Sequence, residues 1–295
     1  MSYNRPHIQF GAHLYVPADQ PRLLESARRR DVSAVIFDLE DSVAPDRKDL
    51  ALTAVLEELL GSSHRGQLWI RLNSGARALA EVTRIAAAQP AELRGVWVPK
   101  AERSQQVDLI ADVLPQTMLI GVIVESATGL FALPRLLAHP RVNAVQLGEV
   151  DLSADLGIDT TDAAAMDPYR ALVVASAAAA RVAPPIGPVS DRLDDMSEFA
   201  RTSKQLAARG FAGRGCLNPA QADIAERTFR PSLQEVTAAR QLIQEYQRAL
   251  VQGTGVLRTD GVMIDEASVR QAKATLAKLG VPEEGGPDFG TSGRG

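Results

Sequence analysis

The sequence predicts an α/β protein, a (β/α)₈ TIM barrel with a C-terminal helical extension. Three observations support this fold: eight short apolar segments, helix-like segments between them, and charged residues directly after several of the apolar segments. Eight strands alternating with helices over about 210 residues favour a closed barrel over an open sheet. An open doubly wound sheet more often has a glycine-rich phosphate-binding turn after its first strand, and VPADQP is not such a turn.

The expected strands are short apolar runs bounded by turn-forming residues. They are His13–Pro17, Ala34–Glu40, Leu68–Asn73, Gly95–Lys100, Met118–Ser126, Val142–Asp151, Ala183–Val189 and Gly213–Pro219. The fifth is almost entirely apolar at its start, as expected of a parallel strand that is covered on both faces. The seventh is the weakest, because Pro184, Pro185 and Pro188 interrupt it.

Helices are expected between the strands. The clearest are Arg22–Arg30, Arg47–Leu60, Leu79–Ala88, Gln105–Val113 and Met196–Arg209. After the fifth strand we expect a turn at Gly129-Leu130 and then a helix over Phe131–Ala138. This start is chosen because Pro134 is tolerated only in the first turn of a helix.

We expect three regions along the chain: a catalytic barrel over residues 1–220, a helical or lid extension over 221–280, and a disordered tail over 281–295. The tail is expected to be disordered because it is rich in glycine and proline.

Within the extension, Ser232 with Glu235 forms a capping-box pattern at the start of a helix that reaches Ala249. A short hairpin is expected to turn at Asp260-Gly261, and a last helix covers Ala267–Leu279.

Composition narrows the class of protein. The 295 residues carry a net charge of −4, which argues against nucleic acid as the main partner. The single cysteine, Cys216, excludes an intramolecular disulfide. The start lacks the apolar core of a secretory signal, and the alanine-rich run Ala171–Ala180 is too short to span a membrane. These features predict a cytoplasmic protein with no membrane partner and a small-molecule substrate.

Charged residues gather where the expected strands end. Because the carboxyl ends of parallel strands meet at one rim of a barrel, we expect five acids and two bases to lie together there. They are Asp38, Glu40, Asp41, Arg71, Lys100, Glu125 and Asp151. One interpretation is an ion-pair network that only closes the mouth of the barrel.

A bound cation is the other interpretation. Two carboxylates about 5 Å apart repel each other by roughly 3 kcal/mol at an effective dielectric constant near 20. A raised pKa, Arg71 or a cation must offset this repulsion. With five acids against Arg71 and Lys100, a cation is favoured, and ligation by so few protein oxygens favours Mg²⁺.

Several ordered motifs resemble those of the HpcH/HpaI aldolase/citrate lyase family, in the branch of citrate lyase beta subunits and malyl-CoA lyases. They are LYVPADQPRLLESA, AVIFDLEDSVAPDRK, WIRLN, VPKAE, VESATG, LGEVDLSADLG and DGVMIDEASVRQA. The resemblance implies Mg²⁺-dependent cleavage or formation of a citryl-, malyl- or citramalyl-CoA-like thioester, giving an acyl thioester and a 2-oxo acid. An aldolase that acts without CoA and a beta subunit that depends on an acyl carrier protein remain alternatives.

The resemblance also implies roles for particular residues. Glu125 and Asp151 match the family's metal ligands, and Arg71 matches its substrate-binding arginine. Asp265 matches an acid that donates or accepts a proton in a neighbouring subunit's site, which implies a homo-oligomer, a trimer or hexamer. An aspartate before a helical segment is also a typical N-cap, so this second role for Asp265 stays open.

Further residues are expected to bind substrate or to support the site. The backbone N–H groups of Gly148, Glu149 and Val150 are expected to bind the carboxylate of the 2-oxo acid, because glycine permits close approach. Glu125 is expected to contact substrate as well as metal. Four charged residues are expected to orient metal-bound water or Arg71; they are Asp38, Glu40, Asp41 and Lys100.

Overall fold

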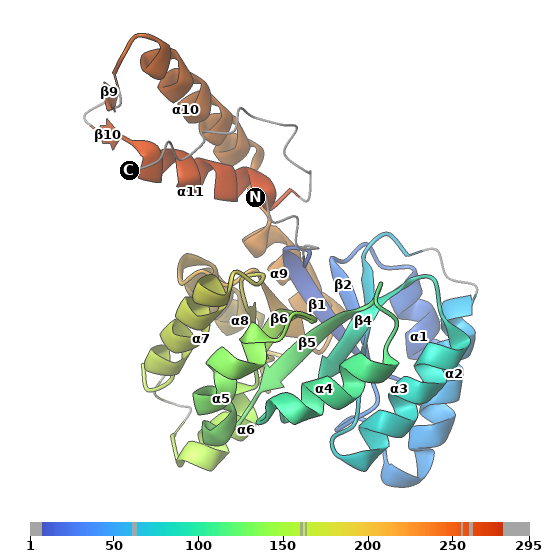
Figure 1. Cartoon of the computed structure of the whole chain (residues 1–295). Helices are drawn as coiled ribbons and strands as arrows, with labels where there is room; N and C mark the ends of the chain where they lie inside the picture. Colours follow the sequence, from blue (N-terminus) through green and yellow to red (C-terminus); the bar gives the residue numbers. More distant parts are fainter. Residues whose placement is uncertain are drawn as a thin grey trace. The chain divides into compact units, whose positions relative to one another are not determined.

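The chain forms two compact units. A computed structural model describes residues 8–60, 64–159, 162, 164–254, 256–259 and 262–279 (Figure 1). The units comprise Met1–Phe229 and Arg230–Gly295. The boundary expected after residue 220 falls within α9 (Pro219–Phe229), a helix that packs on β1 and β8 of the barrel. The tail expected over 281–295 lies outside the described residues.

The first unit is a closed barrel of eight parallel strands in sequence order, which confirms the predicted fold class. The strands are β1 (Gly11–Pro17), β2 (Ala34–Asp38), β3 (Gln67–Arg71), β4 (Leu93–Val98), β5 (Leu119–Val124), β6 (Val142–Leu147), β7 (Ile186–Gly187) and β8 (Gly213–Cys216). Helices cover the outside of the barrel (Figure 1). Besides α9 they are α1 (Pro21–Arg28), α2 (Lys48–Leu60), α3 (Ala76–Ala88), α4 (Ser104–Val113), α5 (Ala127–Ala138), α6 (Glu149–Leu156), α7 (Asp167–Ala180) and α8 (Met196–Ala208).

Alternate residues of each strand face the lumen and the helices. In β2, Ile36 belongs to the inner apolar cluster, whereas Phe37 belongs to the outer one. Two fully buried tryptophans, Trp69 and Trp97, fill the lumen with ring centroids 5.4 Å apart. Gly121 makes room for them, since a Cβ there would lie 2.4 Å from Cε3 of Trp97. The lumen is therefore a packed core below the rim.

The seam at β7 is the thinnest part of the barrel, as its prolines predicted. β7 has two residues and pairs with β6 only through Ile186 and Gln146. Arg214 of β8, which is 5% exposed, reinforces this region. Its guanidinium donates to the carbonyls of Pro188 and Phe199 at 3.1 and 3.0 Å and lies 4.0 Å from the ring centroid of Phe199. A side chain thus replaces part of the missing strand pairing.

Several predicted boundaries are wrong in the same direction. The strands end earlier than expected, so that Glu40, Lys100 and Glu125 lie in the connections after the strands rather than on them. β6 ends at Leu147, and Asp151 lies in the first turn of α6, because Gly148 is the N-cap of a helix that follows at once.

The helix after β5 also begins earlier than predicted. α5 starts at Ala127, where the Ser126 side chain caps it by accepting a hydrogen bond from the backbone N–H of Gly129 at 3.1 Å. Pro134 therefore lies inside the helix. A cap and a buried face of four leucines outweigh the roughly 3 kcal/mol that an internal proline costs; they are Leu130, Leu133, Leu136 and Leu137.

The second unit contains α10 (Leu233–Val251), β9 (Leu257–Thr259), β10 (Val262–Ile264) and α11 (Glu266–Ala277). The predicted capping box of Ser232 and Glu235 is present, and β9 and β10 pair antiparallel. The turn residues Asp260 and Gly261 lie outside the described residues. Within the described part of the chain, no helix combines the length and apolar character needed to cross a membrane.

We expect Gly121→Ala to lower the free energy of unfolding by about 1–3 kcal/mol, because the added methyl group overpacks the lumen against Trp97. Urea titration checks this. In a Trp97→Leu background the same substitution is expected to cost less, since the clashing ring is gone. An equal cost in both backgrounds contradicts this account of the lumen.

Candidate active site

A cavity of about 510 Å³ opens at the carboxyl ends of the strands. It brings together Asp38, Asp41, Arg71, Glu125 and Asp151, five of the seven charged residues that the sequence placed at this rim. Gly148, Glu149 and Val150 also line it. Polar residues at this end of a barrel are where enzymes of this fold carry out their chemistry.

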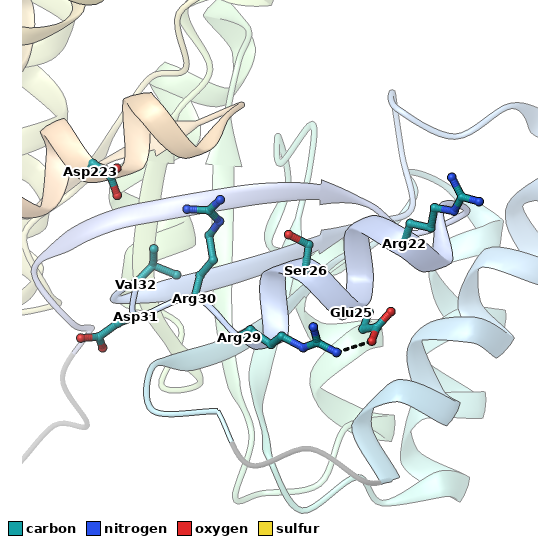
Figure 2. Close-up of a pocket in the computed structure, with 8 residues that line it drawn as sticks. All are labelled: Arg22, Glu25, Ser26, Arg29, Arg30, Asp31, Val32 and Asp223. Atoms are coloured by element: carbon teal, nitrogen blue, oxygen red, sulfur yellow. Dashed lines mark hydrogen bonds and ion pairs between the residues drawn. The ribbon is translucent and has the colours of Figure 1, made fainter.

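A second hollow, of about 500 Å³, lies beside α1 (Figure 2). Its charges are balanced, three arginines against three acids, and Arg29 is paired with Glu25 at 2.5 Å. Its lining residues are Arg22, Glu25, Ser26, Arg29, Arg30, Asp31, Val32 and Asp223. Asp31 and Val32 precede the amino end of β2, and the other lining residues lie on or just after α1 or on α9. This hollow is therefore not at the carboxyl ends of the strands and is not the candidate active site.

Arg71, at the end of β3, is the centre of the charged rim. Its Nε and Nη2 donate to the two carboxylate oxygens of Asp38, both at 2.6 Å. Its Nη1 lies 3.1 Å from a carboxylate oxygen of both Glu40 and Asp41. Burial disfavours the charged form of Arg71. The hydrogen bonds that Arg71 donates to Asp38, and the charge of Asp38, outweigh burial and raise the arginine pKa above its usual value. The forked face of this guanidinium is therefore committed to Asp38.

Glu40 and Lys100 do not line the cavity, contrary to the expectation that all seven charged residues would share it. Glu40 is buried and lies between two cations. Its Oε2 is the oxygen near Arg71, and its Oε1 is 3.0 Å from Nζ of Lys100. Burial still raises the Glu40 pKa despite Arg71. Since both residues contact Arg71 or its partners, they support the cavity from outside.

Glu125 is 6% exposed and follows β5. Its Oε1 accepts a hydrogen bond of 2.6 Å from the backbone N–H of Lys100, a residue in the left-handed conformation with φ of 49°. Burial, the charge of Glu40 and the charge of Asp151 raise its pKa to about 8, against the Lys100 hydrogen bond that lowers it. Burial contributes most to this rise in pKa, and the two neighbouring acids add to it.

Asp151 lies in the first turn of α6, where helix geometry exposes backbone N–H groups. The turn is held by Glu149, whose two oxygens each accept a hydrogen bond of 2.6 Å from Arg170. The Glu149 side chain is thus engaged with α7. The expected role of the Gly148 N–H in binding substrate is wrong, because that group donates to the carbonyl of Val124 at 2.9 Å. The N–H groups of Glu149 and Val150 remain candidates.

Gly148 has a steric role instead. Its φ is −92°, so the backbone does not require glycine. A Cβ at this position, however, would lie 2.7 Å from Cβ of Glu125 and 2.9 Å from its Oε2. Gly148 therefore leaves the space that Glu125 occupies.

Tyr15 and Gln146 also line the cavity and were not predicted from the sequence. The Tyr15 hydroxyl donates to Oε1 of Gln146 at 2.6 Å, and the guanidinium of Arg71 lies 5.2 Å from the Tyr15 ring centroid. Burial raises the Tyr15 pKa, so the phenol keeps its proton. The sequence signal that could have identified them is a polar residue at a lumen-facing position of β1 and of β6, because polar residues are unusual in a barrel core.

The rim divides its acids into two sets. Arg71 and Lys100 pair with Asp38, Glu40 and Asp41. Over the described residues, no ion pair within 4.0 Å joins Glu125 or Asp151 to a basic side chain. In the same part of the chain, no group of three or more His, Cys, Asp or Glu is arranged to hold a metal ion. Mg²⁺ binds through one or two carboxylates and keeps several waters, so this pair of acids fits Mg²⁺ better than an ion that requires a full set of protein ligands.

Asp265 is the N-cap of α11, and its carboxylate accepts a hydrogen bond of 2.9 Å from the backbone N–H of Ser268. That bond lowers the Asp265 pKa. The alternative role as a cap is therefore present in this chain, and the acid is held ionised rather than protonated.

We expect Glu125→Gln to be more stable than the unmodified protein above pH 8 in the absence of divalent cations, by on the order of 2 kcal/mol. The folded protein holds a proton on Glu125 up to about pH 8, whereas the unfolded chain releases it near 4.5. Stability due to this group is therefore full at acid pH and is lost as pH rises from 4.5 to 8. Urea unfolding in EDTA at pH 5 and pH 9 measures the difference.

The exposed acid Glu57 supplies the matched control for that measurement, and Glu57→Gln is expected to change stability equally at both pH values. A difference between Glu125→Gln and the unmodified protein that is the same at pH 5 and pH 9 contradicts the raised pKa.

We expect Gly148→Ala to lower kcat/KM by at least about tenfold while the protein remains folded, since the new methyl group displaces the Glu125 carboxylate. Steady-state kinetics and a thermal melt measure the two effects. A variant with full activity shows that the position of Glu125 is not critical.

Comparisons with known proteins identify the family. The sequence pattern of the HpcH/HpaI aldolase/citrate lyase family matches residues 12–219. A (3S)-malyl-CoA thioesterase of Cereibacter sphaeroides is 30% identical over 272 residues, covering 91% of this chain and 94% of the relative. An L-malyl-CoA/beta-methylmalyl-CoA lyase of the same species is 28% identical and covers 89% of this chain and 92% of the relative.

A solved structure agrees as well. Protein CitE from Mycobacterium tuberculosis, in complex with magnesium, acetoacetate and coenzyme A, has a TM-score of 0.73 at 25% identity, covering 92% of this chain and 99% of CitE. The chain therefore belongs to the HpcH/HpaI aldolase/citrate lyase family and is a carbon–carbon lyase of the citrate lyase beta subunit and malyl-CoA lyase type.

Proposed function

We propose that this protein is a Mg²⁺-dependent lyase that cleaves or forms a citryl-, malyl- or citramalyl-CoA-like thioester. The observation that carries the proposal is that, among the described residues, Glu125 and Asp151 form no ion pair with a basic side chain, whereas the other acids that line the cavity are paired with Arg71, Lys100 or Arg170. Relatives named for malyl-CoA, and CitE with magnesium and coenzyme A, support the choice of thioester and ion.

Glu125 and Asp151 would hold the Mg²⁺. When bound, the ion supplies Lewis-acid stabilisation of developing oxygen charge. A cation would also offset the charges of Glu40 and Asp151, which add to burial in raising the pKa of Glu125.

The reaction breaks the bond between the carbinol carbon and the carbon next to the thioester carbonyl. The hydroxyl proton passes to solvent water and the carbinol becomes the carbonyl of the 2-oxo acid. The electron pair of the broken carbon–carbon bond passes to the thioester as an enolate, which then takes a proton. Arg71 contributes a fixed positive charge beside this oxygen, and Asp38 keeps its guanidinium in place. The N–H groups of Glu149 and Val150, at the start of α6, would bind the oxo-acid carboxylate.

We propose that Asp265 of one subunit completes the site of a neighbour in a trimer or hexamer. With its lowered pKa, Asp265 is an ionised acceptor for the proton that the acyl thioester loses in synthesis. In cleavage, Asp265 must first take a proton from water before it donates one to the enolate. The resemblance of DGVMIDEASVRQA to the family pattern supports this role.

We expect the purified chain with Mg²⁺ to release oxaloacetate, glyoxylate or pyruvate together with an acyl-CoA from one of a panel of citryl-, malyl- and citramalyl-CoA thioesters. Mass spectrometry identifies the products, and EDTA is expected to abolish them. Release of free CoA and the intact hydroxy acid would indicate hydrolysis, the activity in the name of the (3S)-malyl-CoA thioesterase. Activity only on a carrier-bound thioester, or only on a free aldol, would replace the proposal by one of the two alternatives.

We expect Glu125→Ala and Asp151→Ala each to lower turnover by at least about a hundredfold while the barrel stays folded, because each removes half of the protein's Mg²⁺ ligands. Asp112→Ala, on the exposed side of α4, is the matched control and is expected to leave turnover unchanged. Full activity in either cavity variant counts against the metal site.

A further inference from the structure

The cavity has an apolar side that the proposed chemistry does not use. Val150, Leu193 and Leu217 line it, and they remain 52%, 47% and 41% exposed. They lie after β6, β7 and β8, whereas Asp38 and Arg71 are the last residues of β2 and β3, and Glu125 directly follows β5. We call these three apolar residues the apolar wall. The cavity therefore has a charged side and an apolar side.

Polar contacts hold the apolar wall in place. Nδ2 of Asn218 donates to the carbonyl of Leu193 at 3.1 Å, which fastens the connection after β7 to the one after β8. The backbone N–H of Leu217 donates to the buried side chain of Gln221 at 2.8 Å. The two leucines are thus kept at the cavity instead of collapsing into the core.

Val150 is held in a similar way. It lies in the first turn of α6, between Glu149, which is clamped by Arg170, and Asp151. Its side chain is consequently a fixed neighbour of the proposed metal ligand. A substrate carboxylate bound by the N–H groups of Glu149 and Val150 would therefore lie next to this side chain.

We propose that the substrate carries an alkyl chain longer than methyl, on the acyl unit or on the 2-oxo acid, and that this chain packs on the apolar wall. A methyl group has the reach of a single side-chain contact, whereas the wall spans three connections of the barrel. Covering these side chains removes apolar surface from water, which favours binding in proportion to chain length. The inference rests on the proposed lyase function and specifies its substrate class.

The test measures kcat/KM for condensation in two series. One series combines acetyl-, propionyl-, butyryl- and hexanoyl-CoA with glyoxylate; the other combines acetyl-CoA with glyoxylate, pyruvate, 2-oxobutyrate and 2-oxovalerate. In one series we expect kcat/KM to rise by about fourfold for each added methylene until the wall is covered. The series that shows the rise identifies which reactant bears the chain.

Variants connect this rise to the apolar wall. Leu193→Asn and Leu217→Asn are expected to flatten the dependence on chain length. Leu172→Asn is the matched control, because Leu172 is 43% exposed on α7 and does not line the cavity. It is expected to keep the full dependence.

Four outcomes overturn the inference. Lyase activity with no dependence on chain length in either series shows that the wall does not bind an alkyl chain, although the proposed function stands. If the leucine variants lower kcat/KM equally for every substrate, the apolar wall contacts the thioester arm that all the substrates share. A changed oligomeric state in those variants assigns it to a contact between copies of the chain. Absence of lyase activity on every thioester removes the proposed function and this inference together.

Discussion

The contacts of Arg71 with three carboxylates are the interaction on which the charged rim depends. The Arg71 side chain is 12% exposed, and its Nε and Nη2 bind the two oxygens of Asp38. Its Nη1 lies near both Glu40 and Asp41. Leaving a buried acid without such a partner costs several kcal/mol. Because Arg71 and Lys100 pair with these acids, Glu125 and Asp151 are without an ion pair among the described residues, which supports their proposed role as metal ligands. The division of charge at the rim thus separates structural acids from those available for chemistry.

The sequence predicted the barrel, its strand order and most of its helices, because apolar runs of strand length alternate regularly with helix-like segments. It also placed the charged residues at the correct end of the barrel. It misjudged where the elements begin and end. Periodicity does not distinguish the last residue of a strand from the first extended residue of a loop, so Glu125 was assigned to β5. Likewise, a strong cap at Ser126 overrode the helix boundary that Pro134 suggested.

The site was less predictable than the fold, because its contacts depend on strand register and on residues that are far apart in the sequence. That the Gly148 N–H donates to the carbonyl of Val124 depends on the register between β5 and β6, which one sequence does not reveal. The contact of Tyr15 with Gln146 joins residues 131 positions apart. Tyr15 lies in the motif LYVPADQPRLLESA, but nothing in the sequence pairs it with Gln146. Glu40 and Lys100 were placed inside the cavity because residues near strand ends converge on it, but their mutual ion pair keeps Glu40 buried between two cations.

The unequal construction of the barrel wall has a consequence for how the protein moves. Long strand ladders hold β2, β3 and β5, whereas β7 depends on two residues and on the guanidinium of Arg214. Amide hydrogen exchange should therefore be fastest around β7, as expected where local opening breaks few backbone bonds. Local opening at β7 would shift the loop that carries Leu193 while leaving the positions of Glu125 and Arg71 unchanged. Mutations around β7 could therefore change substrate preference without moving Arg71 or Glu125.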